Sequence, residues 1–307
     1  MPIWSEILTE IGPKTLLNYD QVRRKYLVDL FLKTNRPVIL YATAWVQKPS
    51  LQSNDFSIND EDIQALMEVS KGIGGNDLDL ILHSPGGSTA ATEAIVFYLR
   101  SRFTNIRVIV PQLAMSAATL LACSANKIVL GKHSFLGPTD PQISISTNLG
   151  VRFVPAQAVL DQFDLAKREC TDDPVNINAW APILRQITPD LLIQCKSALE
   201  MTKILARSWL EKYMFVGDKD PSRKAEEISS WLSDHQEFKS HSKHISREEI
   251  EAKGMIVEYL EADQEFQDIV LSVYHSTTHT FTGTPAVKIV ENHLGRAFIK
   301  LDLPKIN

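Results

Sequence analysis

Cysteine, basic charge and long apolar runs are all scarce in this chain. Its 307 residues include three cysteines, Cys123, Cys170 and Cys195, whose spacing matches no zinc site and leaves one thiol over in any disulfide scheme. This usage predicts a reducing, cytoplasmic setting. The 32 basic residues are outnumbered by 37 acidic ones, so the net charge is −5. No basic face for a nucleic acid is therefore expected.

Membrane spans, export signals and repeats are not evident either. Uncharged apolar runs stay shorter than the ~18 residues that a membrane-spanning helix needs. Residues 1–6 lack both a basic segment and an apolar core, so no signal peptide is expected. No solenoid period or low-complexity segment appears. The apolar content of 44% is instead ample for the core of one large domain.

The chain does contain a regular succession of apolar strands and helices. Strands are expected at residues 37–42, 78–83, 106–110 and 127–130. Helices are expected between them, at 88–101 and 116–125 among others. Strands separated by helices of this length pair in parallel through right-handed crossovers. The fold class is therefore predicted to be α/β.

The rest of the chain is expected to add helices around this α/β core. A helical pattern over residues 1–35 predicts an N-terminal arm. Residues 36–307 are then the main domain, with a helical insertion at about 182–232. These boundaries follow from changes in the hydrophobic pattern alone.

The C-terminal part carries three local predictions. Ser246 and Glu249 have the spacing of a capping box, which predicts a short helix. A last amphipathic helix is expected over 262–275, because the threonines that follow disfavour a longer one. A small strand pair is expected over 286–302.

Two turns bear the residues that point to chemistry. Residues 84–87 read Ser-Pro-Gly-Gly after the strand at 78–83, and residues 114–118 read Ala-Met-Ser-Ala-Ala after the strand at 106–110. Both lead into helices at the edge of a parallel sheet, where ligands bind in such folds. The first turn can expose free N–H groups, and the second presents Ser116 at a helix start. Together they outline an oxyanion hole and a nucleophile, as in a serine hydrolase.

Three segments in order, LILHSPGG at 80–87, AMSAATL at 114–120 and LGPTDPQ at 136–142, resemble the Clp-protease/crotonase superfamily. Within it, the chain is most similar to the serine dehydrogenase proteinases, relatives of the signal peptide peptidase A type. The likeness covers about residues 36–145 and resumes more weakly over 241–288. It implies a ββα spiral with additional helices, homo-oligomers, and an ATP-independent serine endopeptidase acting on protein or peptide substrates through an acyl-enzyme. It implies no cofactor.

The resemblance also gives roles to the residues of the two turns. Ser116 would be the nucleophile, and the N–H groups of Gly87 and Ala117 would hold the oxyanion, with Gly86 as an alternative donor. The structural alternatives are an ordinary helix N-cap for Ser116 and a plain tight turn for the glycines.

The general base is less sharply defined. Residues 137–142 contain no histidine, although the Clp proteases carry theirs in this loop. His241 stands where the serine dehydrogenase proteinases have a threonine-histidine pair. We therefore expect the two partners to be exchanged, with His241 as the base and Asp140 fixing its tautomer. Lys167 and Lys196 are the alternatives, because the signal peptide peptidase type uses a lysine.

Other functions stay open at this point. Crotonase-like acyl-CoA chemistry uses the same oxyanion fold but usually a glutamate, and Glu93 is the only one close to the glycine turn. A scaffold or binding protein with a decayed site is the other alternative. His133, His235 and His244 are expected at the surface. No metal site is expected from the spacing of His235, His241 and His244, or from that of His275 and His279.

Overall fold

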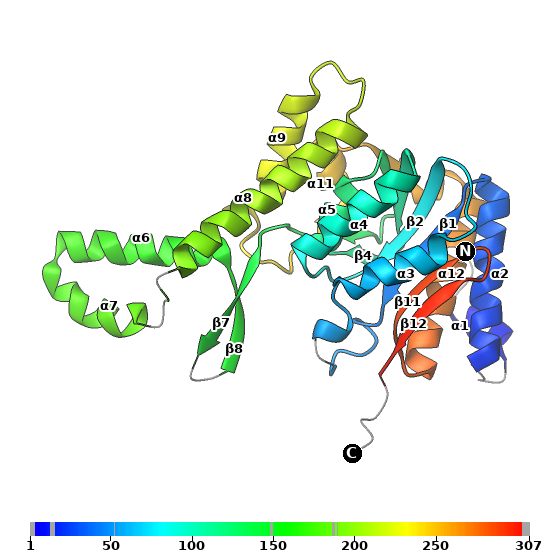
Figure 1. Cartoon of the computed structure of the whole chain (residues 1–307), viewed down its shortest axis with the longest axis horizontal. Helices are drawn as coiled ribbons and strands as arrows, with labels where there is room; N and C mark the ends of the chain where they lie inside the picture. The colour runs from blue at the N-terminus through cyan, green and yellow to red at the C-terminus, as the bar shows by residue number, and fades with distance from the viewer. Residues whose placement is uncertain are drawn as a thin grey trace.

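A central sheet of seven strands organises the computed structural model, which describes residues 4–12, 16–51, 53–147, 150–185, 188 and 190–302 (Figure 1). In spatial order its strands are β10 (Val257–Tyr259), β5 (Lys127–Leu130), β3 (Asn105–Val110), β2 (Asp77–His83), β1 (Val38–Thr43), β11 (Ala286–Asn292) and β12 (Ala297–Leu301). The strands from β10 to β1 run parallel, and β11 and β12 are antiparallel. The predicted α/β class and the C-terminal strand pair are confirmed.

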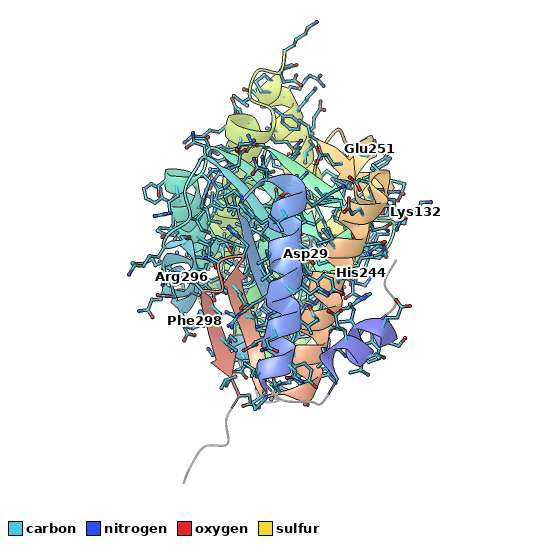
Figure 2. All side chains as sticks on the ribbon, turned by 90° about the vertical axis from the view of Figure 1, so that its right-hand side faces the viewer. Asp29, Lys132, His244, Glu251, Arg296 and Phe298 are labelled. Atoms are coloured by element: carbon cyan, nitrogen blue, oxygen red, sulfur yellow. The ribbon has the colours of Figure 1, made fainter. Side chains whose placement is uncertain are left out.

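Helices cover both faces of this sheet, which explains why its strands are nearly continuous apolar runs. One face packs on α3 (Glu61–Ser70), α4 (Thr89–Arg102) and α5 (Ala117–Cys123), through buried Leu66, Ile95 and Leu120. The other face packs on α2 (Leu16–Thr34) and α12 (Gln264–Gly283). In Figure 2, where Asp29 marks α2, these two helices lie side by side.

The N-terminal helices pack closely against the rest of the chain, and the boundary of the expected N-terminal arm at residue 35 stays a prediction. Leu27 and Leu30 of α2 are fully buried in the core beneath the sheet. The buried Arg23 guanidinium lies 2.5 Å from Glu291 Oε2 on β11 and donates to Thr280 Oγ1 on α12. Helix α1 (Trp4–Ile11) packs against α12 in turn. An amphipathic pattern predicted the helix but not the surface that it covers.

A lobe projects from the body at the far left of Figure 1. It begins with the hairpin of β7 (Gln142–Thr147) and β8 (Gly150–Pro155) and continues through α6 (Ala156–Asp172), α7 (Ile177–Leu184) and the first half of α8 (Leu191–Trp209). We call the described residues between 142 and 199 the projecting lobe. It has a small core of its own, formed by Ala156, Val159, Leu191 and Cys195. The additional helices thus begin well before residue 182, and α9 (Pro221–Leu232) packs on α8.

The C-terminal predictions are largely confirmed, with one correction. Ser246 and Glu249 form both bonds of the capping box at the start of α11 (Arg247–Ala252). Helix α12, however, continues to Gly283 through the threonines that were expected to end it. Thr277 and Thr280 are buried, and their hydroxyls donate to the carbonyls of Val273 and Ser276 one turn earlier. Packing of α12 against α2 outweighs the low helix propensity of threonine. None of the described helices is both long and apolar enough to cross a membrane.

His83, the last residue of β2, predicts how stability depends on pH. Its ring is buried near Trp45 and Tyr274, and burial lowers its pKa to about 4. Below pH ~6.5 the unfolded chain protonates this histidine, whereas the folded chain does not until the pH nears 4. The free energy of unfolding is therefore unaffected by His83 above pH ~6.5 and falls as the pH drops towards 4. Between pH 7 and pH 4.5 we expect the parent to lose about 2 kcal/mol more of its free energy of unfolding than His83→Phe. Urea unfolding at pH 7 and pH 4.5 measures it. The exposed His244, changed to Gln, is the control, and an equal acid loss in the parent and His83→Phe would contradict the prediction.

Candidate active site

Ser116 occupies a strained turn between β4 (Leu113–Ala114) and α5. Its φ is 53° and its ψ −120°, a conformation that residues with a Cβ rarely adopt. The side chain makes no N-cap hydrogen bond, and no described residue bonds its hydroxyl. Ser116 is therefore not an ordinary N-cap, because it does not make the side-chain hydrogen bond that defines one. Backbone strain of this kind, in a partly exposed residue whose hydroxyl makes no described hydrogen bond, is typical of functional sites.

The glycine turn packs directly against the turn of Ser116. Ser84 N–H donates to Leu113 O at 3.1 Å, and Met115 N–H donates back to Ser84 O at 2.9 Å. At Gly86, φ is +95°, and a Cβ there would lie 2.6 Å from Met115 O and 2.8 Å from Ser116 Cβ. A side chain at this position would therefore push the turn of Ser116 away.

Ile58 holds the other side of the glycine turn. Its N–H donates to Gly86 O at 2.8 Å, and its carbonyl accepts from Ser88 N–H at 2.9 Å. A Cβ on Gly87 would lie 2.4 Å from both the N and the O of Ile58. The N–H groups of Gly87 and Ala117 make no hydrogen bond within the described part of the chain, so they can receive an oxyanion.

A small three-stranded sheet places the remaining candidates at the same edge. Strand β4 pairs in parallel with β6 (Phe135–Leu136), which pairs antiparallel with β9 (Ile245–Ser246). Ala114, Leu136 and Ile245 stand in one row. The residues that follow β4 and β6 and those that precede β9 therefore leave the sheet at one edge. These are the segments of Ser116, Asp140 and His241.

Asp140 is the centre of this edge, and it contacts two histidines. Its carboxylate is buried, with His241 Nδ1 at 2.6 Å from Oδ1 and His235 Nδ1 at 3.0 Å from Oδ2. The predicted pair of His241 and Asp140 is thus in contact, whereas its catalytic role stays a prediction. His235, which was expected at the surface, is the first residue of α10 (His235–Phe238). Nothing in the sequence pattern distinguishes it.

Part of this chain is similar to a known family and to two other proteins. Residues 56–180 match the family model of ClpP-like SDH-type serine proteinases. Over this segment the chain is similar to the serine dehydrogenase proteinases of the ClpP-like superfamily. The uncharacterized proteins MJ0137 and MJ1495 of Methanocaldococcus jannaschii are 46% and 42% identical to this chain over 66 residues. Each match covers 22% of this chain and 23% of the relative's length.

The matched segment contains Ser116, Gly86, Gly87, Ala117 and Asp140, but His241 lies outside it. No hydrogen bond joins Ser116 to a histidine or a lysine among the residues described. Unliganded active sites often have catalytic hydrogen bonds that form only with substrate. The alternative bases Lys167 and Lys196 are exposed side chains of α6 and α8 in the projecting lobe.

Metal and cofactor sites receive no support from the histidines. The part of the chain that the structure describes holds no cluster of histidine, cysteine and acidic side chains suited to a metal. His279 packs against Trp4 with tilted rings whose centroids are 3.9 Å apart, and its Nε2 lies 2.8 Å from the Trp4 carbonyl oxygen. Burial lowers the pKa of His275 to about 4.

Gly87 provides a test of the glycine turn. We expect Gly87→Ala to lower kcat by ~10²–10³ with a smaller change in KM, because the turn must move away from Ile58 and its N–H then misses the oxyanion. Steady-state kinetics on a peptide substrate measure both constants. Gly75→Ala is the matched control, since Gly75 also has a positive φ, +86°, but open space around it. An unchanged kcat in Gly87→Ala would remove this residue from the site.

Proposed function

We propose that this chain is a serine endopeptidase that hydrolyses peptide bonds through an acyl-enzyme on Ser116. The observation that carries the proposal is the strained, unengaged Ser116 packed against Gly86, with the unbonded N–H groups of Gly87 and Ala117 beside it. Similarity of the matched segment to a proteinase family supports the same chemistry. Neither ATP nor a cofactor takes part in the proposed reaction.

In the proposed reaction, Ser116 Oγ attacks the substrate carbonyl carbon and passes its proton to His241 Nε2. The carbonyl oxygen becomes an oxyanion, which the Gly87 and Ala117 N–H groups bind. His241 then protonates the leaving amine as the C–N bond breaks and the acyl-enzyme forms. Water, deprotonated by the same histidine, releases the acid product and restores Ser116. Asp140 supports this role because its oxygen, 2.6 Å from His241 Nδ1, favours the tautomer with an unprotonated Nε2.

A fluorophosphonate probe separates this proposal from its alternatives. We expect a covalent adduct on Ser116, located by mass spectrometry of the digested protein. Binding of acyl-CoA without labelling favours crotonase-like chemistry, in which no serine nucleophile is needed. A protein that neither reacts with the probe nor binds acyl-CoA favours a decayed scaffold, and either result contradicts the peptidase.

Homo-oligomer formation belongs to the proposal, and the projecting lobe supports it. Val151 and Phe153 on β8 and Ile193 on α8 are exposed by 62%, 65% and 68%. Apolar side chains gathered on one lobe are typical of surfaces that another protein covers. Sedimentation velocity tests this part, and a monomer at all concentrations would contradict it.

The finer fold and the location are also proposals. A ββα spiral is supported by the parallel order β1, β2, β3, β5, together with the short strands β4 and β6 that leave for a second sheet. A cytoplasmic location is supported by the free thiols of Cys123 and Cys195, both buried. Burial raises the pKa of the Cys123 thiol to about 12, so it is not a reactive nucleophile.

A further inference from the structure

Both oxygens of the Asp140 carboxylate are occupied by side-chain nitrogens. His241 Nδ1 lies 2.6 Å from Oδ1, while His235 Nδ1 lies 3.0 Å and Gln142 Nε2 3.3 Å from Oδ2. The Asp140 side chain is only 2% exposed. Water therefore has little access to replace either histidine.

This arrangement fixes the protons on both imidazole rings. An ionised carboxylate only accepts hydrogen bonds, so each Nδ1 must carry a hydrogen. In the neutral rings, both Nε2 atoms are then unprotonated. The ring of His241 is thereby ready to accept a proton, and the ring of His235 is not needed for that step.

Helix α10, which begins at His235, is fixed at both ends. Asp234 caps α10, with its Oδ1 accepting from the N–H groups of Gln236 and Glu237 at 2.8 and 3.2 Å. Phe238, at the other end of α10, is buried beside Trp231, with ring centroids 5.3 Å apart. Because both ends of α10 are fixed in this way, the His235 side chain can hold the Asp140 carboxylate in place.

We propose that His235 is a positioning residue, which anchors Asp140 Oδ2 so that Oδ1 keeps the His241 ring in its base-ready tautomer. The proposal rests on the peptidase function proposed for Ser116. Without His235, the long contact to Gln142 would be the only one left to Oδ2 among the described residues. The carboxylate would then be free to rotate, and a buried acceptor left short of a donor is costly. The orientation of His241 would loosen as a result.

Two substitutions separate positioning from mere structure. His235→Ala removes the donor, whereas His235→Asn offers an amide N–H close to the place of Nδ1. We expect His235→Ala to lower kcat about 10- to 100-fold with KM nearly unchanged, and His235→Asn to restore most of the loss. His244→Ala is the control, because His244 is exposed and its ring contacts Phe135 instead of Asp140.

Nitrogen-15 NMR of the imidazole rings gives a readout that does not need activity. We expect His241 to be the Nδ1–H tautomer in the parent and in His235→Asn, and a mixture of tautomers in His235→Ala. Unchanged His241 signals in His235→Ala, or equal losses of kcat in the Ala and Asn variants, would overturn the proposal. Failure of the peptidase function looks different, because the parent itself would then be inactive while the NMR comparison still reports on His235.

Discussion

Ser116→Ala is expected to abolish peptide hydrolysis while the fold and its stability stay unchanged. If Ser116 is the proposed nucleophile, its loss removes the acyl-enzyme route, so kcat should fall by ~10⁴–10⁶, as it does in known serine peptidases. Stability should change by less than ~0.5 kcal/mol, because the Ser116 hydroxyl has no described hydrogen-bond partner and makes no cap bond. Peptide turnover and urea unfolding of the same preparation measure the two effects.

Ser246 provides the matched control, because it is a serine that does cap a helix. Its Oγ accepts from Glu249 N–H at 3.2 Å within the capping box of α11. Ser246→Ala should therefore lower the free energy of unfolding by ~1 kcal/mol and leave kcat unchanged. The two variants thus have opposite signatures. Full peptidase activity in Ser116→Ala would show that another residue attacks the substrate.

The elements around Ser116 could be predicted from the sequence because each carries a local signal. The strands β2 and β3 are apolar runs buried on both faces, and the turns after β2 and before α5 contain the residues that tight backbone approach requires. Gly86 is an example, since its φ of +95° and its contact with Met115 exclude a side chain. Local pattern and three-dimensional packing agree there.

The other half of the site depends on pairings that leave no local signal. Strands β4, β6 and β9 contain two residues each, too short for any periodicity. Their pairing brings together residues 114, 136 and 245, which are distant in the sequence. The contact of His241 with Asp140 was therefore expected only from the family resemblance, and that of His235 was missed altogether. Helix α12 was predicted too short for a related reason, since its threonines bond within the helix and pack against α2.

His241→Ala is expected to lower kcat by ~10²–10⁴, the range that a general base contributes. Activity at acidic pH should also lose its dependence on this imidazole, because only the neutral ring accepts the Ser116 proton. Asp140→Asn should show a smaller loss, since the ring remains but its tautomer is no longer fixed. Rate measurements from pH 5 to pH 9 on the parent and the single variants test this prediction.

The double variant His241→Ala/Asp140→Asn decides whether the two residues act as one unit. If Asp140 acts through His241, the double variant should be no slower than His241→Ala alone, because the aspartate has nothing left to orient. Additive losses would mean that Asp140 has an independent role, for example in the fold. Lys167→Ala and Lys196→Ala are the controls for the alternative base, and both should keep full activity because these side chains are exposed in the projecting lobe. A large loss in either lysine variant, together with an active His241→Ala, would replace the triad by a serine–lysine dyad.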